Sequence, residues 1–283
     1  MSGIRTVLLD RARNLSPAHQ ALIHPGWRRH LVPGAVALAM LVTYVFALIR
    51  FDFSFARIFD GLEQLGFILY FMLPPDAEGQ FLIFTRALGE TVAIALLGTL
   101  LGAILAFPLS LLAARNVMTN RILQFSSRRL FDGVRGIDTL IWALIYVNVV
   151  GLGPFAGVLA IASSDMAGFA KTFSEAMEAT EKNATEGVRS TGGRRSDEIV
   201  FGLLPQVMPV LISQVLYFFE SNTRSATIIG IVGAGGIGLF LSDTIRTGEW
   251  QQVSLLILMI LVVVSVIDFV STRLRFAIIG QRG

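Results

Sequence analysis

The longest uncharged stretch of this sequence covers residues 139–164, which are 26 consecutive positions. A helix needs about 20 predominantly apolar residues to cross a bilayer. The whole chain is 54% hydrophobic and only 15% charged, whereas soluble domains contain about 25% charged residues. The sequence therefore predicts a membrane protein that crosses the bilayer several times.

Six segments are long and apolar enough to be predicted as membrane spans, and they predict an all-α membrane protein. The uncharged run 139–164 is too long for one comfortable span, so we expect two spans that turn at Gly151–Pro154. Residues 66–75 are too short to cross and are expected at the membrane interface. The predicted spans are residues 31–50, 88–113, 133–150, 154–171, 205–219 (extending into the polar residues 220–224) and 251–270.

Basic residues set the predicted orientation, because Lys and Arg collect on the cytoplasmic side of membrane proteins. Residues 1–30 contain five Arg and one acid, and residues 114–138 contain five Arg and two acids. Six crossings place these segments and both termini in the cytoplasm of a bacterial inner membrane. A seventh span at 225–242 would place the basic C-terminal tail outside. We therefore expect 225–242 to be re-entrant or pore-lining.

This orientation divides the chain into a cytoplasmic arm, residues 1–30, and one transmembrane domain, residues 31–283. Because the basic residues lie between apolar spans, they indicate topology and not nucleic-acid binding.

The composition excludes several kinds of chemistry. The chain has no cysteine, and its histidines are His19, His24 and His30 in the N-terminal arm. Cysteine-ligated metals and paired metal-binding histidines are therefore not expected, and we predict no metal site, cofactor or catalytic residue. No P-loop motif occurs, so the energy for active transport would come from a partner or an ion gradient. The predicted spans show no ladder of acids for a proton relay, and Glu90 is expected to be a polar helix-end residue.

A glycine string at Gly233–Gly238 matches the G-x-G-x-x-G pattern of dinucleotide sites. That function requires a soluble βαβ unit, which the apolar surroundings do not offer. Close helix packing or a broken-helix turn is the better interpretation, because glycine lets backbones approach and bend. Gly98 and Gly102 form a G-x-x-x-G pair on the second predicted span, and we expect them to pack against another helix.

A polar hinge, residues 171–199, interrupts the apolar sequence. Asn183 followed by Glu186 is typical of a capping box, and Gly192–Gly193 is typical of a helix stop. These signals predict a short helix over 184–191, which would be marginal alone in water. We therefore expect it to dock into a groove of a partner on the cytoplasmic face.

The hinge resembles the EAA loop of bacterial ABC-importer permeases, whose pattern is E-A-A, three residues, G, nine residues and I-x-L-P. Glu186 precedes Gly192 by six positions, and Leu204–Pro205 close the pattern at the expected distance. Gly187–Val188 and Gly202 depart from it, since alanines and an isoleucine are usual there. The resemblance implies a coupling helix within the loop 171–205. The implied coupling residues are Glu186, Gly187, Arg189, Gly192, Leu204 and Pro205. Pro205 is also expected to begin the fifth span, where its missing N–H is harmless.

Three longer strings are similar to the permease subunit of phosphonate importers, a group that includes phosphite-type transporters. They are "VGLGPFAGVLA" (150–160), "LLPQVMPVLIS" (203–213) and "FESNTRSATIIGIVGAGGIG" (219–238), and the resemblance covers about residues 88–275. It implies a type I ABC importer permease fold that works as a homodimer. The implied partners are two ATP-binding cassette subunits, which hydrolyse the ATP, and a periplasmic substrate-binding protein.

The resemblance also implies a solute path near the last of these strings. A guanidinium at Arg224 would match an oxyanion through paired hydrogen bonds. Glu220 and Arg224 are four residues apart, so they could equally form a structural pair on one helix face, and both interpretations stay open. The expected path residues are Glu220, Ser221, Asn222, Arg224, Gly233, Gly235 and Gly236.

The sequence is thus interpreted as the transmembrane subunit of an ATP-driven importer of phosphonates or related phosphorus oxyanions, embedded in lipid. An ion-coupled secondary transporter of a small anion is the alternative. It is disfavoured because neither internal repeats nor a ladder of acids is visible. A membrane enzyme acting on lipid has no Ser/His/Asp or metal cluster to support it.

Overall fold

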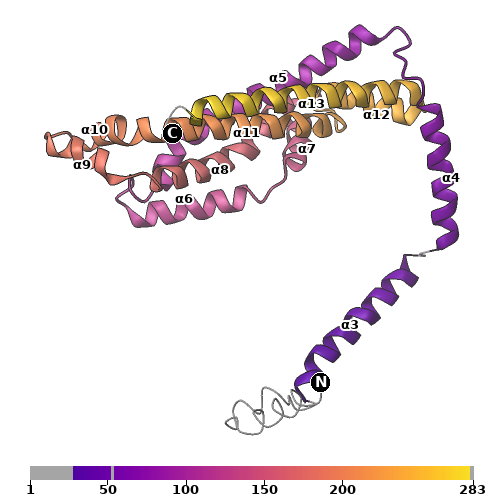
Figure 1. The fold of residues 1–283 in the computed structure, drawn as a ribbon, viewed down its shortest axis with the longest axis horizontal. Helices are drawn as coiled ribbons and strands as arrows, with labels where there is room; N and C mark the ends of the chain where they lie inside the picture. The colour runs from indigo at the N-terminus through magenta and orange to yellow at the C-terminus, as the bar shows by residue number, and fades with distance from the viewer. Residues whose placement is uncertain (1–27, 52–53, 281–283) are drawn as a thin grey trace, which may run out of the picture. The chain divides into compact units, whose positions relative to one another are not determined.

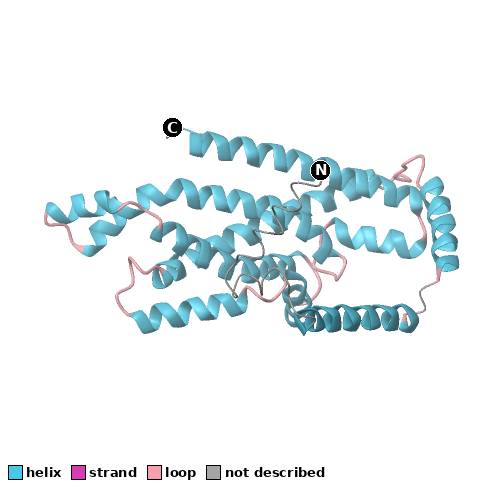
Figure 2. Cartoon of the chain, turned by 60° about the horizontal axis from the view of Figure 1, so that its bottom comes forward, coloured by secondary structure: helices cyan, strands magenta, loops and turns pink. Residues whose placement is uncertain are grey.

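The structure is a computed structural model that describes residues 28–51 and 54–280. Every regular element within these ranges is a helix, as Figure 2 shows. The chain divides into two compact units, Met1–Phe67 and Ile68–Gly283. Most of the predicted cytoplasmic arm, including His19 and His24, lies outside the described residues. The all-α fold class is confirmed.

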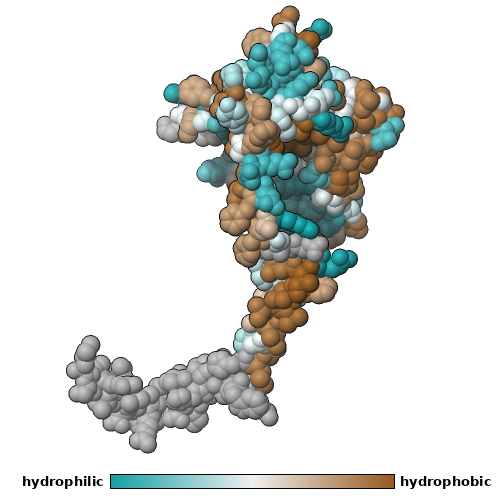
Figure 3. Space-filling view, turned by 90° about the vertical axis from the view of Figure 1, so that its right-hand side faces the viewer, coloured by the Kyte–Doolittle hydropathy of each residue, from teal (hydrophilic) through white to brown (hydrophobic). Residues whose placement is uncertain are grey.

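The described part of the first unit consists of α3 (Arg28–Arg50) and most of α4 (Phe55–Phe71). In Figure 3, the column between the two grey regions is residues 28–51, and it is almost entirely apolar. No residue of α4 is buried. A helix with apolar side chains all round suits a bilayer, so α3 matches the predicted span 31–50. Residues 66–71 are the last turns of the longer helix α4, and the interface location of segment 66–75 stays a prediction.

The second unit is a bundle whose long helices are α5, α8, α11 and α13 (Figure 1). The short helices α9 and α10 lie at one end of this bundle, and α12 lies towards the other. The bounds are α5 (Phe81–Ala113), α6 (Arg121–Val134), α7 (Thr139–Val150), α8 (Pro154–Glu178), α9 (Lys182–Ser190), α10 (Arg195–Asp197), the π-helical turn η1 (Glu198–Leu203), α11 (Leu204–Gly230), α12 (Ile237–Thr247) and α13 (Trp250–Ile279).

Four helical stretches of the described residues have the length and apolar composition to cross a membrane: Leu31–Arg50, Phe81–Ala113, Arg195–Gly230 and Trp250–Ile278. The pair α6 and α7, bent by 84°, would count as a fifth. Helix α8 is not among them, because polar residues such as Ser163, Ser164 and Asp165 lower its hydropathy. The count of six spans stays a prediction.

Helix α5 begins at Phe81, before the predicted start of the span 88–113. Phe84 is fully buried, and it packs in one core cluster with Ile237 of α12 and Leu256 of α13. Burial of apolar side chains outside the most hydropathic segment therefore extends this helix.

The third predicted span, 133–150, is interrupted near its start. Helix α6 ends at Val134 and α7 begins at Thr139, because the carboxylate of Asp138 accepts a hydrogen bond from the N–H of Leu140. Such a cap fixes a new helix start. The next helix, α8, begins at Pro154 as predicted but continues to Glu178 beyond the predicted end.

The ambiguous segment 225–242 is divided between two helices. Helix α11 continues past the predicted polar extension at residues 220–224 to Gly230, and α12 begins at Ile237. The turn between them contains three glycines with φ near +80° to +90°, a region that residues with a Cβ rarely adopt. They are Gly233 (φ +92°), Gly235 (φ +84°) and Gly236 (φ +77°). No continuous seventh span forms in this described segment.

Glycines bring α5 and α8 into direct contact. A Cβ atom on Gly98 would lie 2.7 Å from the Cβ of Ile161, and one on Gly102 would lie 3.1 Å from the carbonyl oxygen of Ala162. The prediction that this pair packs against another helix is confirmed.

We expect Gly98→Ala to destabilise the bundle, because the added methyl group would force α5 and α8 apart. Overpacking a tight core costs about 1–3 kcal/mol, and each kcal/mol lowers Tm by about 2–4 °C in a chain of this size. The measurement is the apparent Tm of the purified protein in detergent. Gly89→Ala on the same helix is the matched control, because a Cβ there meets no atom within 4 Å. Equal Tm values for both variants would contradict the prediction.

Candidate coupling helix and solute path

Helix α9 (Lys182–Ser190) is exposed along its length and has no buried residue. Its N-cap is Glu181, and no side chain caps its first turn. The predicted capping box of Asn183 and Glu186 is therefore wrong. The helix already includes Asn183, so that side chain is not at the N-cap position.

The predicted glycine stop of this helix is confirmed. Gly192 has φ +83°, which is the left-handed conformation typical of a residue just past a helix end. Its N–H donates to the carbonyl of Arg189 at 3.0 Å, and the N–H of Gly193 donates to the carbonyl of Val188 at 3.2 Å. These bonds satisfy carbonyls that the last turn leaves without a helical partner.

Helix α9 packs closely on the π-helical turn η1 through Gly202. A Cβ atom on Gly202 would lie 2.9 Å from the Cα of Thr185. Gly202 is the position where the sequence departs from the usual isoleucine of the EAA pattern. The absence of a side chain there lets the backbones of η1 and α9 touch.

Pro205 lies in the first turn of α11 but does not start the helical run, which is continuous from Arg195 to Gly230. Its place at the start of α11, where its missing N–H is harmless, is as expected, although helical turns already precede it. Just before it, the N–H of Leu204 donates to the carbonyl of Ile199, five residues back. Such wider π-helical turns are rare and occur mostly as single turns within α-helices.

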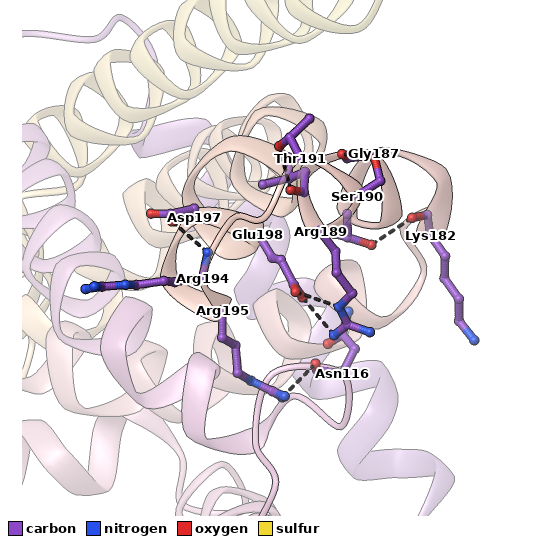
Figure 4. Close-up of polar contacts among 12 residues, drawn as sticks. Asn116, Lys182, Gly187, Arg189, Ser190, Thr191, Arg194, Arg195, Asp197 and Glu198 are labelled. Carbon is purple, nitrogen blue, oxygen red and sulfur yellow. Dashed lines mark hydrogen bonds and ion pairs between the residues drawn. The ribbon is translucent and has the colours of Figure 1, made fainter.

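An ion pair also joins α9 to η1. The guanidinium of Arg189 donates from Nε to Oε1 of Glu198 at 2.8 Å and from Nη2 to Oε2 at 3.2 Å, as Figure 4 shows. The hydrogen bond and charge of Glu198 raise the pKa of Arg189, and Glu186 adds to this effect. The paired geometry fixes the orientation of α9 on η1.

The loop after α5 supports the other side of this assembly. Nη2 of Arg195 donates to the carbonyl of Val117 at 2.6 Å, and in Figure 4 its side chain points to the loop that contains Asn116. In the same loop, Nδ2 of Asn116 donates to the carbonyl of Met177 at 2.6 Å. A cavity of about 410 Å³ lies between this loop, α9 and η1.

The exposed face of α9 suits a contact with another protein. Among the residues that the structure describes, no group of three or more His, Asp or Glu side chains is placed to hold a metal ion. Glu186, Gly187, Arg189 and Gly192 all lie on α9 or at its end, whereas Leu204 and Pro205 lie past η1.

The second candidate site surrounds Glu220, which is 7% exposed in the middle of α11. Its Oε2 lies 2.8 Å from Nη2 of Arg275 on α13, and its Oε1 lies 3.4 Å from Nη2 of Arg224. The predicted pair with Arg224 is present, but the shorter contact is to Arg275. The side chain of Arg224 is 52% exposed, so it retains donors for another partner.

Sequence reasoning missed Arg275, because it was counted only as part of the basic C-terminal tail. Its side chain also lies over the ring of Tyr217, with the guanidinium carbon 5.7 Å from the ring centroid. The ion pair of Arg275 with Glu220 depends on the antiparallel packing of α11 and α13. The spacing of residues within one helix does not reveal such a contact.

Asn222 points to the opposite side of α11 and is buried. Its Nδ2 donates to Oγ1 of Thr99 at 2.8 Å and to Oδ2 of Asp165. Asp165, within the predicted span 154–171, was not singled out from the sequence, because it immediately follows the long uncharged run. The spans therefore contain a buried acid, although not a ladder of acids.

The glycine turn of residues 233–236 is buried against α5 and the start of α8. The N–H of Gly236 donates to Oε1 of Glu90 at 2.8 Å, and the N–H of Ile237 donates to Oγ1 of Thr91 at 2.8 Å. Glu90 is therefore not a helix-end residue: it lies inside α5 and caps the N-terminus of α12. A Cβ atom on Gly235 would lie 2.8 Å from the nitrogen of Pro154. The packing interpretation of the glycine string is confirmed.

Comparison with known proteins agrees with this architecture. A family profile described as binding-protein-dependent transport system inner membrane component matches residues 106–279. The chain belongs to this family. It is a multi-pass inner-membrane protein and an ABC importer permease.

Curated relatives match nearly the whole chain. HtxC of Stutzerimonas stutzeri, whose name assigns it to a phosphite transport system, is 39% identical over 90% of this chain and 89% of its own length. The phosphite transport system permease PtxC of the same species is 30% identical over 88% of this chain and 90% of its own length. The phosphate-import permease PhnE of Mycolicibacterium smegmatis is 34% identical over 96% of this chain, which matches 49% of that longer protein.

Among solved structures, a chain of the inward-facing MetNI methionine ABC transporter matches with a TM-score of 0.64. The match covers 72% of this chain and 99% of that chain at 20% identity. Likeness at this identity shows the fold.

We expect Gly202→Ile, which restores the residue usual in the EAA pattern, to displace α9. The new side chain would enter the space of the Thr185 backbone. Amide hydrogen exchange of residues 182–190 should become at least tenfold faster, because the contact that holds α9 is lost. Val200→Ile is the control, since Val200 lies in the same turn and is exposed. Unchanged exchange in Gly202→Ile would show that α9 does not depend on this contact.

Proposed function

We propose that the chain is the transmembrane subunit of an ATP-driven importer of phosphonates or related phosphorus oxyanions. Two copies would assemble with two ATP-binding cassette subunits and receive solute from a periplasmic binding protein. The partner subunits would hydrolyse ATP, and this chain would make and break no bond. The observation that carries the proposal is α9, which is exposed towards a partner and braced on its other side by η1.

The coupling role follows from how α9 is held. The helix is too short to be stable alone, but the Arg189–Glu198 ion pair and the Gly202–Thr185 contact fix it on η1. Because η1 continues into α11, a force on α9 passes directly into a long helix of the bundle. In this proposal α9 and both chain termini face the cytoplasm. Residues 1–30 form a cytoplasmic arm and residues 31–283 one permease domain with the coupling loop 171–205.

The substrate class is supported by the relatives and by the charges around Glu220. The relatives are named for phosphite and phosphate import, and both solutes are phosphorus oxyanions. Arg224 and Arg275 both contact the buried carboxylate of Glu220, so this cluster has one excess positive charge. The half-exposed guanidinium of Arg224 is suited to pair with an oxyanion.

Fewer of the predicted path residues can contact a solute than the sequence predicted. Arg224 and the half-buried Ser221 have exposed surface, whereas both donor hydrogens of the Asn222 amide are bonded to protein. Gly233, Gly235 and Gly236 are buried. In this proposal the three glycines and Asn222 shape the path without touching the solute.

Reconstitution tests the function directly. The chain should co-purify with a P-loop ATPase, and liposomes containing both should take up phosphite or a phosphonate only with ATP and the loaded binding protein. ATP hydrolysis should also rise when the loaded binding protein is added. Uptake by this chain alone in ATP-free liposomes, driven by an ion gradient, would establish the secondary-transporter alternative instead.

We expect Arg224→Gln to lower the uptake rate by about tenfold to a hundredfold, because a hydrogen bond to a charged group contributes about 1.5–3 kcal/mol. Assembly with the ATPase should be unchanged, as measured by co-purification. The control is Arg273→Gln, because Arg273 on α13 is exposed and lies over the ring of Phe269. Normal uptake by Arg224→Gln would assign Arg224 to the structural pair with Glu220.

A further inference from the structure

Three buried polar side chains from three helices meet inside the bundle. They are Thr99 on α5, Asp165 on α8 and Asn222 on α11, with exposed fractions of 0%, 6% and 5%. One atom, Nδ2 of Asn222, donates to both of the other side chains. We call these three residues the polar clamp.

The clamp uses the donors of Asn222 completely. An amide nitrogen has two hydrogens, and here one goes to a hydroxyl of α5 and the other to a carboxylate of α8. Within residues 28–51 and 54–280, no ion pair joins Asp165 to a basic side chain. The bond from Asn222 is therefore the principal polar contact of this buried acid, and losing it would leave the carboxyl without a donor.

Close helix packing brings the clamp residues together. A Cβ atom on Gly102 would lie 3.1 Å from the Cβ of Asp165, so the glycine face of α5 allows the carboxyl to reach this position. Next to Asp165, Ser164 accepts a hydrogen bond from Thr139 at 2.9 Å, and Ser163 lies 2.7 Å from the hydroxyl of Tyr146. These bonds tie α7 to α8 at the same level.

Two of the three helices that the clamp joins, α8 and α11, are the helices on either side of α9 in the chain. Helix α8 ends at Glu178, just before α9, and α11 continues from η1, just after it. At 1.5 Å per residue, the clamp lies about 20 Å from the end of α8 and about 27 Å from the start of α11. Polar groups thus link α8 and α11 at two separate levels, through α9 and η1 at their ends and through the clamp, and an apolar cluster that includes Phe169, Phe173, Val207 and Leu211 packs the two helices together between these levels.

We propose that the polar clamp makes α8 and α11 move as one body when α9 is displaced, so that the displacement reaches Arg224. Arg224 follows Asn222 by two residues on the same helix, so the clamp sets its position. Asn222, Asp165 and Thr99 are positioning residues in this proposal. The inference rests on the proposed coupling function of α9.

The clamp differs from the many buried hydroxyls that bond within their own helix. Thr223, the neighbour of Asn222, is 2% exposed, and its hydroxyl donates to the carbonyl of Phe219 on the same helix. That bond does not link two helices. Thr223→Val is therefore a matched control that removes a buried hydroxyl beside the clamp and leaves the clamp intact.

The first experiment compares coupling in liposomes that contain the complete transporter with its ATPase and binding protein. In Asn222→Asp the donor is replaced by a second carboxyl, so ATP hydrolysed per solute imported should rise at least tenfold while ATPase activity stays within twofold. Asp165→Asn retains a carbonyl acceptor and should change this ratio by less than threefold. The double variant Asp165→Asn/Asn222→Asp exchanges donor and acceptor and should restore the ratio to within threefold of the unmodified protein.

The second experiment needs neither solute nor ATPase, so it separates a failure of this inference from a failure of the proposed function. The chain has no cysteine, so spin labels can be attached to Glu175→Cys on α8 and Met208→Cys on α11, both exposed positions. The distance distribution between the labels should broaden in Asn222→Asp and narrow again in the double variant. Thr223→Val should leave it unchanged.

Three results would overturn the inference. These are a distance distribution unaffected by Asn222→Asp, a double variant that restores neither readout, and a Thr223→Val variant with the same loss of coupling. If Asn222→Asp does not assemble, Thr99→Val takes its place, because it keeps the side-chain volume and removes one clamp bond. It should raise the ATP-to-solute ratio about threefold, and an unchanged ratio would contradict the inference.

Discussion

The close contact of α5 with α8 is the constraint on which the other features of the second unit depend. Gly98 and Gly102 remove the side chains that would hold these helices apart. The short distance lets Thr99 and Asp165 reach the same amide of Asn222, and it places Glu90 and Thr91 beside the glycine turn before α12. In an apolar environment, where helix association depends on close packing, such small residues determine which polar groups can meet.

Several buried polar side chains of the bundle bond to a partner from a different helix. Glu90 satisfies an N–H of α12, Glu220 pairs with Arg275 of α13, and Asn222 bridges α5 and α8. An unpaired polar group in a low-dielectric interior costs much more than the bond itself contributes. The polar residues therefore specify which helices are neighbours, while the apolar residues determine that helices form at all.

Much of the fold could be predicted from the sequence, because hydropathy and glycine are local signals. The apolar segments around residues 31–50 and 251–270, the turn at Gly151–Pro154 and the stop at Gly192 all appear where the sequence places them. The predictions fail where contacts with residues distant in the sequence determine the bounds of a helix. Phe84 extends α5 because Ile237 and Leu256 cover it.

In the candidate sites, too, features set by local sequence were predicted and features set by distant contacts were not. The position of α9 followed from a charged stretch between apolar ones, but its first turn did not, because Glu181 at the N-cap makes no capping bond for a pattern to detect. Asp165 and Arg275 were missed since their partners are 57 and 55 residues away in the chain. Gly202 looked like a departure from the family pattern, and only the contact with Thr185 explains it.

The two ends of the bundle are held by different kinds of bonds, so the two ends differ in stiffness. At the end that carries α9, the Arg189–Glu198 pair includes a guanidinium that is 68% exposed, and such pairs are weak and screened by salt. At the opposite end, Glu90 and Thr91 bond backbone N–H groups in a buried turn. Raising the ionic strength would thus soften one end and leave the other stiff, so the bundle is compliant where α9 is held and rigid around the glycine turn.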